Sequence, residues 1–95
     1  MHKWDMMFEW DNEKSRSNHA KHGIDFDTAK ALWNDVNRVE IQSPYPLESR
    51  TILIGRLDKK LWTAIFTQRR SAVRIISVRR SRKREANLYG QKENG

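Results

Sequence analysis

The fold is decided by residues 51–78, which read TILIGRLDKKLWTAIFTQRRSAVRIISV. Three runs within this stretch are rich in β-branched and aromatic residues, and each predicts a strand. The three runs are 51–54, 61–67 and 73–78. Only the polar turn 57–60 and the short connection 70–72 separate them. Because connections this short join neighbouring strands, we expect an antiparallel meander.

A short strand and a polar helix are predicted before the meander. Residues 8–11 alternate apolar and acidic side chains, which is typical of a half-buried strand. Asp11 or Asn12 caps the following helix, which ends near His22 because Gly23 suits the left-handed position at a helix end. This helix is nearly all polar, so we expect it to contribute little to the core. We expect four of its side chains to point outward, and these are Lys14, Asn18, Lys21 and His22.

The second predicted helix is amphipathic and serves the core. Asp25 caps it, and its apolar residues recur at spacings of three and four, which favours packing on a sheet. These residues are Phe26, Ala29, Leu32 and Trp33. A further strand is expected at 38–42. Ser81 caps a last helix that runs through Leu88, and the residues after Tyr89 form a polar tail that we expect to be frayed.

Together these elements predict an α+β domain. We expect an antiparallel sheet of three to four strands, with the two N-terminal helices on one face and a C-terminal helix. The turn Pro44-Tyr45-Pro46 separates the strand at 38–42 from the strand at 51–54, because prolines bar a regular ladder there. One domain over 1–90 and a flexible polar tail at 91–95 are expected. The second sheet face can stay wet and forms a concave basic surface. Its expected lining is Arg50, Arg69, Arg74 and Arg79.

The positive charge of the chain is concentrated in its C-terminal part. Residues 1–58 carry 8 basic and 10 acidic side chains, whereas residues 59–95 carry 11 basic and 2 acidic ones. No acidic residue lies between Asp58 and Glu85. Such a block predicts an anionic partner, either a nucleic acid or an acidic protein surface. The arginines are interleaved with the apolar residues of 73–78, which disfavours a simple solvated tail.

The composition excludes several classes of protein. Without cysteine there are no disulfides, thiolate zinc sites or thiol nucleophiles, which fits a reducing cytoplasm. No apolar run approaches the roughly 20 residues that span a bilayer, and no export signal is apparent, so we expect a cytoplasmic protein without membrane contact. His19 and His22 lack a third metal ligand nearby, so neither a metal nor a cofactor is expected.

The remaining chemistry is that of arginine. A guanidinium donates two parallel hydrogen bonds to two phosphate oxygens and stabilises the extra negative charge of a phosphodiester transition state. RNA is the natural substrate because its own 2′-hydroxyl attacks the adjacent phosphorus. The general base stays open among four residues, which are His22, Lys14, Glu48 and Tyr89. Trp4 and Trp62 are the candidates for stacking on bases.

A second reading from another class is a binding module without catalysis. It would either bind nucleic acid or inhibit a target such as DNA gyrase by contact. New 5′ ends on bare RNA would distinguish the enzyme from this alternative.

The order and spacing of short motifs over about eighty residues resemble the BrnT toxins. The matching residues are Phe8-Glu9-Trp10-Asp11, Lys14, Asn18, Lys21-His22-Gly23, Phe26, Ala29, Glu48-Ser49-Arg50, Ile54-Gly55, Thr67-Gln68-Arg69, Arg74-Ile75-Ile76-Ser77-Val78-Arg79, Glu85 and Tyr89. The resemblance implies a RelE-like fold and mRNA cleavage, with or without the ribosome, that stops translation. It also implies a BrnA-like antitoxin with a ribbon-helix-helix DNA-binding domain, and a complex that represses its own promoter.

The resemblance also assigns site residues. Activity maps onto Arg50, Arg69 and Arg79, with Lys14 and His22 as neighbours on the first helix. Apart from the resemblance, the basic residues of the C-terminal part and one tyrosine are expected to hold substrate or antitoxin, and these are Arg74, Arg80, Arg82, Lys83, Arg84 and Tyr89. Two departures stand out. The first is Gln68, which replaces a glutamate that is common in the family, so a carboxylate base is doubtful there. The second is the sequence of residues 33–36, which should only reshape the turn after the second helix.

Overall fold

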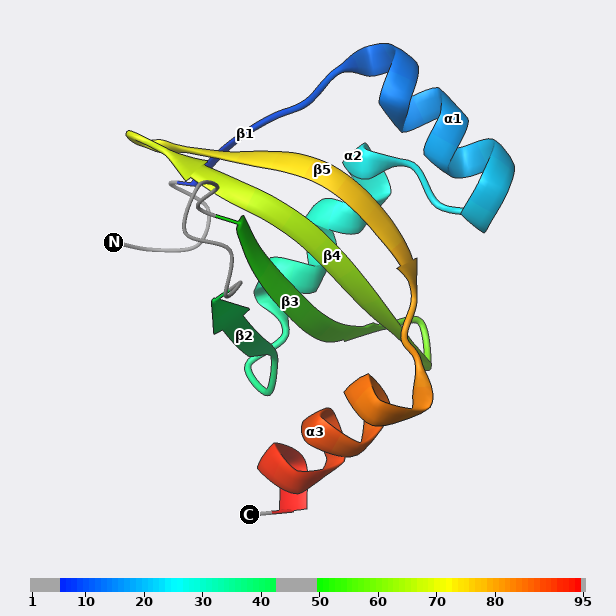
Figure 1. Cartoon of the computed structure of the whole chain (residues 1–95), viewed down its shortest axis with the longest axis vertical. Coiled ribbons are helices and arrows are strands. Elements are labelled where there is room, and N and C mark those ends of the chain that lie inside the picture. The colour runs from blue at the N-terminus through cyan, green and yellow to red at the C-terminus, as the bar shows by residue number, and fades with distance from the viewer. Residues whose placement is uncertain (1–5, 43–49, 95) are drawn as a thin grey trace.

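In a computed structural model that describes residues 6–42 and 50–94, five strands form one sheet in the order β1-β5-β4-β3-β2 (Figure 1). The elements in chain order are β1 (Met7–Glu9), α1 (Asn12–His22), α2 (Phe26–Ala29), the 3₁₀ helix η2 (Lys30–Asn34), β2 (Val39–Gln42), β3 (Arg50–Leu57), β4 (Lys60–Arg69), β5 (Ala72–Arg80) and α3 (Lys83–Asn94). The α+β class is therefore confirmed. The likeness to RelE stays a prediction.

The sheet is mixed, which corrects the expected antiparallel sheet of three to four strands. Strands β2 to β5 form the predicted antiparallel meander, with the turns at 58–59 and 70–71. Strand β1 adds to the free edge of β5 and runs parallel to it, with Phe8 opposite Val73. This pairing joins segments more than sixty residues apart, so no turn signal in the sequence predicts it. The predicted proline turn at 44–46 lies outside the described residues.

One face of the sheet carries the main core. Helices α2 and η2 lie behind the sheet in Figure 1 and pack on buried residues of β3, β4 and β5. The Trp33 ring stands edge-on to Phe8 and to Phe66, with ring centroids 5.2 Å apart in each pair. The predicted apolar stripe is confirmed as core, but its helix is not continuous. Only Phe26–Ala29 is α-helical, and Lys30–Asn34 tightens into a 3₁₀ helix.

Helix α1 has the predicted caps but one buried side chain that we expected outside. The Asp11 carboxylate accepts hydrogen bonds from the N–H groups of Glu13 and Lys14, and Gly23 is left-handed with φ 79°. Asn18 is 6% exposed. Its amide bonds both the N–H and the C=O of Val78, so it continues the β5 ladder beyond the end of the short strand β1.

Helix α3 lies against the other sheet face and contacts β2 and β3. Two predictions about this helix are wrong, its Ser81 cap and its end at Leu88. The Ser81 hydroxyl bonds the Thr63 hydroxyl instead of capping the helix, and the Glu85 carboxylate accepts the N–H of Arg82 at the helix start. The helix then continues past Leu88 to Asn94, because Tyr89 is buried within it and anchors it to the domain. The sheet face away from α2 is consequently exposed to solvent only where α3 does not cover it. The flexibility of the tail at 91–95 stays a prediction.

Candidate functional site

A row of polar side chains crosses four adjacent strands on the face away from α2. In this row Arg50 on β3 is opposite Thr67 on β4, and Thr67 is opposite Arg74 on β5. Glu9 on β1 completes the row beside Arg74. Directly paired residues point to the same side of a sheet. Because Val73 and Ile75, the neighbours of Arg74, are in the main core, the row must lie on the opposite, partly open face.

The row borders a cavity of about 420 Å³ that we call the arginine cavity. Its lining residues are Lys14, Arg50, Thr67, Gln68, Arg69, Arg74 and Ile76. The four cations come from four elements, since Lys14 projects from α1 and the arginines from β3, β4 and β5. None of the described residues that line it is acidic. The site therefore concentrates positive charge at one depression, which is the arrangement that binds a phosphate.

Glu9 is a carboxylate paired with one of the arginines that line this cavity. Its Oε2 accepts a hydrogen bond from Nη1 of Arg74 at 2.9 Å, and the two side chains are 40% and 33% exposed. Within the alternating strand, Glu9 is expected on the solvent side, away from the core. The alternation does place it opposite Phe8, but its partner becomes visible only when β1 pairs with β5.

The structure does not bring Arg79 into the arginine cavity. Arg79 is opposite Thr63, nearer the covered end of the face, and both of its terminal nitrogens donate to Glu85 at 2.8 Å. The Glu85 carboxylate also accepts from the Thr63 hydroxyl. The guanidinium of Arg79 lowers the pKa of Glu85 from 4.5 to about 2. Hydrogen bonds from the N–H of Arg82 and from the Thr63 hydroxyl act in the same direction, whereas burial acts against them. This ion pair fixes the start of α3 to the sheet.

Two further predicted residues also lie outside the cavity. His22 is exposed at the C-terminal end of α1 and does not line the cavity. Tyr89, which we expected to hold RNA, is 1% exposed, and its hydroxyl donates to Asp35 at 2.7 Å. Burial together with the Asp35 carboxylate raises the pKa of this hydroxyl. A ring enclosed in this way offers no surface to RNA, which corrects the expectation.

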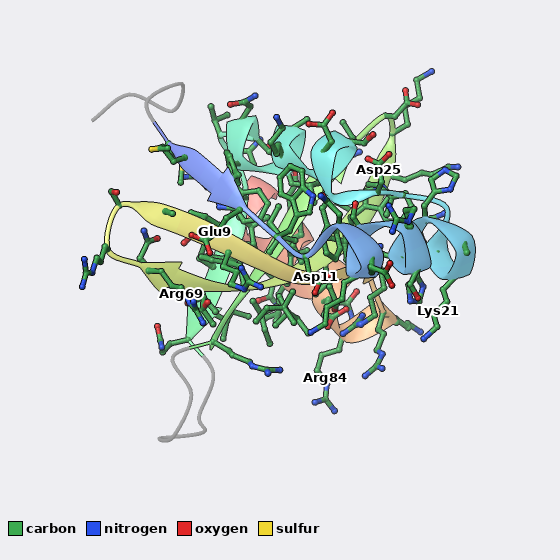
Figure 2. All side chains as sticks on the ribbon, turned by 90° about the horizontal axis from the view of Figure 1, so that it is seen from above. Glu9, Asp11, Lys21, Asp25, Arg69 and Arg84 are labelled. Carbon is green, nitrogen blue, oxygen red and sulfur yellow. The ribbon has the colours of Figure 1, made fainter. Side chains whose placement is uncertain are left out.

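The remaining predicted RNA-binding residues form an exposed basic group where β5 meets α3. They are Arg80, Arg82, Lys83 and Arg84. Figure 2 shows Arg84 at the bottom of the view and Asp25 at the upper right, on the other side of the helix α1 ribbon. Trp62 is only 8% exposed, and the Arg80 guanidinium lies 5.5 Å from its ring centroid, so this ring is already covered. Trp4 and Glu48 lie outside the described residues.

Within the described residues, no three histidine or acidic side chains gather to hold a metal ion. The described helices include none that is long and apolar enough to cross a membrane.

The sequence comparisons identify the family. The family model described as the ribonuclease toxin, BrnT, of type II toxin-antitoxin systems matches residues 10–85, which run from before α1 to the start of α3. Comparison with curated proteins gives no significant match. A match over most of the chain, together with a cationic cavity on an open sheet face, establishes that the chain belongs to the BrnT family of ribonuclease toxins.

Proposed function

We propose that the arginine cavity is the ribonuclease site, and that this toxin cleaves mRNA there and so inhibits translation. The observation that carries the proposal is the convergence of Lys14, Arg50, Arg69 and Arg74 from four elements on one cavity. A phosphate placed in it meets positive charge from several directions. RNA supplies its own nucleophile, so the protein has to orient the strand, neutralise charge and move protons.

The arginines divide into two groups by position. Those of the cavity contact the reacting phosphate, where paired N–H groups match two phosphate oxygens. The exposed basic group at 80–84 holds the neighbouring stretch of RNA. Arg79 supports α3 through Glu85, and His22 contributes only long-range attraction, because neither side chain lines the cavity.

The family implies an antitoxin partner for this toxin. We propose a BrnA-like protein with a ribbon-helix-helix domain, whose acidic residues cover the arginine cavity and imitate phosphate. Promoter DNA would then be contacted only through the antitoxin complex. Because opposite charges attract through water, the affinity of toxin for antitoxin should fall as salt rises.

The test is cleavage of bare RNA by purified, antitoxin-free protein in EDTA, with parallel reactions that contain translating ribosomes. Arg69→Ala removes an exposed cation from the cavity, and Arg16→Ala removes an exposed arginine on α1 whose ion pair is with Glu13. We expect cleavage by the wild type and by Arg16→Ala, and a loss of about 100-fold or more in Arg69→Ala. Equal cleavage by both variants would refute the site. Growth arrest with RNA left intact would support the binding-only alternative.

A further inference from the structure

The proposed reaction needs a group that takes the proton of the 2′-hydroxyl, and the described residues leave few candidates. Glu85 is occupied by the N–H and O–H groups of Arg79, Arg82 and Thr63. Tyr89 is buried and donates to Asp35. His22 is at the far end of α1, outside the cavity. A base must instead be beside the phosphate-binding arginines and exposed to substrate.

Glu9 meets both conditions. Lys14 also lines the cavity, but the proposed function uses it as a phosphate-binding cation, and Glu48 lies outside the described residues. Glu9 lies directly beside Arg74 in the row that crosses the four strands, and its side chain is 40% exposed. Among the described residues, the Arg74 guanidinium is the one group that donates a hydrogen bond to this carboxylate, and it does so to Oε2 alone. The other oxygen, Oε1, is therefore open to a hydroxyl of the substrate.

The Glu9–Arg74 pair also matches the geometry of RNA. A guanidinium has five N–H donors, and Glu9 engages one terminal nitrogen of Arg74, so donors remain for a phosphate. In RNA the 2′-hydroxyl and the 3′-phosphate are on neighbouring ribose carbons. When Arg74 holds the phosphate, a carboxylate 2.9 Å from its nitrogen is close enough to reach the 2′-hydroxyl beside that phosphate.

From this arrangement we propose that Glu9 is the general base of the reaction, an inference that rests on the proposed function. Glu9 accepts the proton of the 2′-hydroxyl, and the 2′-oxygen forms a bond to phosphorus. The bond from phosphorus to the 5′-oxygen breaks, and that oxygen takes a proton from water. The products are a 2′,3′-cyclic phosphate and a 5′-hydroxyl, and the proton on Glu9 returns to solvent.

Charged groups surround Glu9 from each element that packs near it. Arg74 on β5 contacts it directly, while Lys14, Arg50 and Arg69 line the adjoining cavity. On the other face of β1, Asp27 and Lys30 share a cleft with Phe8. A carboxylate base must be ionised to act, so the cleavage rate of the wild type should fall toward acid pH.

The chain offers a closely matched control. Glu40 on β2 accepts from Nε of Arg38 at 3.0 Å with side chains 42% and 29% exposed, against 2.9 Å, 40% and 33% for Glu9 and Arg74. Glu9→Gln and Glu40→Gln therefore remove the same charge from similar ion pairs, and only the first is beside the cavity. In both variants the amide oxygen still accepts from the arginine.

The experiment measures single-turnover RNA cleavage by the two variants and the wild type over the pH range in which all three stay folded. Binding is measured in parallel on 2′-deoxy RNA of the same sequence, which lacks the nucleophile. We expect Glu9→Gln to lose about 100-fold or more in rate, to lose the acid limb of the pH profile, and to bind as tightly as the wild type. Glu40→Gln should match the wild type in all three respects.

A Glu9→Gln rate equal to that of Glu40→Gln, or an unchanged acid limb, would overturn the inference while leaving the proposed function intact. So would a loss of rate explained entirely by weaker binding of the 2′-deoxy RNA. If the wild type leaves RNA intact with and without ribosomes, the proposed function fails, and the assignment of Glu9 fails with it.

Discussion

At the scale of single residues, the domain depends on a few side chains that bond atoms far away in the sequence. Asn18 is the clearest case. Its amide donates to the C=O groups of Ile24 and Val78 at 2.8 and 2.9 Å, and its oxygen accepts the N–H of Val78 at 3.1 Å. One side chain thus satisfies three buried backbone groups where β1 no longer pairs with β5.

Asn18→Ala should therefore destabilise the protein although the residue is on a polar helix. Three buried backbone groups lose their partner, and we expect a loss of about 2–4 kcal/mol in the free energy of unfolding. Urea unfolding of the variant measures this loss. Ser17→Ala, an exposed change on the same helix, should stay within about 0.5 kcal/mol of the wild type. Equal stability of the two variants would show that water replaces the amide.

Glu85 gives a second prediction at this scale, because its pKa falls from 4.5 to about 2 on folding, chiefly through Arg79. A carboxylate with a lowered pKa stabilises the fold above its unfolded value, and this contribution is lost as the pH falls through the folded value. Glu85→Gln should thus cost on the order of 3 kcal/mol at neutral pH. The difference from the wild type should shrink between pH 4.5 and about 2. Urea midpoints at a series of pH values test this, and a difference constant with pH would contradict it.

At the scale of helices and strands, the sequence predicted the elements that depend on residues close together in the chain. The meander, both of its turns, the caps of α1 and the apolar stripe of α2 and η2 follow from spacing and turn residues. The pairing of β1 with β5 and the extension of α3 do not, because each depends on contacts between distant segments. The same limit applies to the site. Arg50, Arg69 and Arg74 could be named from sequence, but Glu9 needed the register of β1.

The hairpin between β3 and β4 supplies a prediction at this scale. Asp58 and Lys59 have φ values of 56° and 69°, and Leu57 pairs with Lys60 across the turn. A two-residue turn with two left-handed residues favours glycine at its second position. Lys59→Gly should therefore raise the free energy of unfolding by about 0.5–1 kcal/mol.

Lys60→Gly is the matched control for this hairpin. It removes the same side chain from the adjacent strand position, where glycine weakens a strand, and should lower the stability by about 0.5–1 kcal/mol. Thermal unfolding of both variants shows whether each substitution raises or lowers the stability. Because neither residue lines the arginine cavity, RNA cleavage should be unchanged in both. A loss of stability in Lys59→Gly would mean that the lysine side chain makes a contribution larger than the relief of backbone strain.

At the scale of the whole molecule, the fold separates the charges that the sequence already divides between its two parts. Exposed basic residues of the C-terminal part lie on one side of helix α1, as Arg84 shows in Figure 2, and Asp25 is on the other. Among the described residues, two carboxylates pair with arginines of this region, Glu9 with Arg74 and Glu85 with Arg79. The described part of the basic side is therefore a surface with strong positive potential in which these two carboxylates are held in place by arginines.

This charge separation predicts the salt dependence of RNA binding. Each phosphate that a cation neutralises releases counterions, and for single strands the slope of log K against log salt changes by about −0.7 per contact. If the four cations of the arginine cavity each contact a phosphate, uncleavable 2′-deoxy RNA should bind with a slope of about −3 or steeper. Arg69→Ala should reduce the slope by about 0.7, and Arg16→Ala should leave it unchanged. Fluorescence titrations at several salt concentrations measure all three. A slope near zero in the wild type would mean that base contacts, rather than phosphate contacts at the cavity, dominate the affinity. The arginines would then stabilise the transition state more than they hold the bound strand.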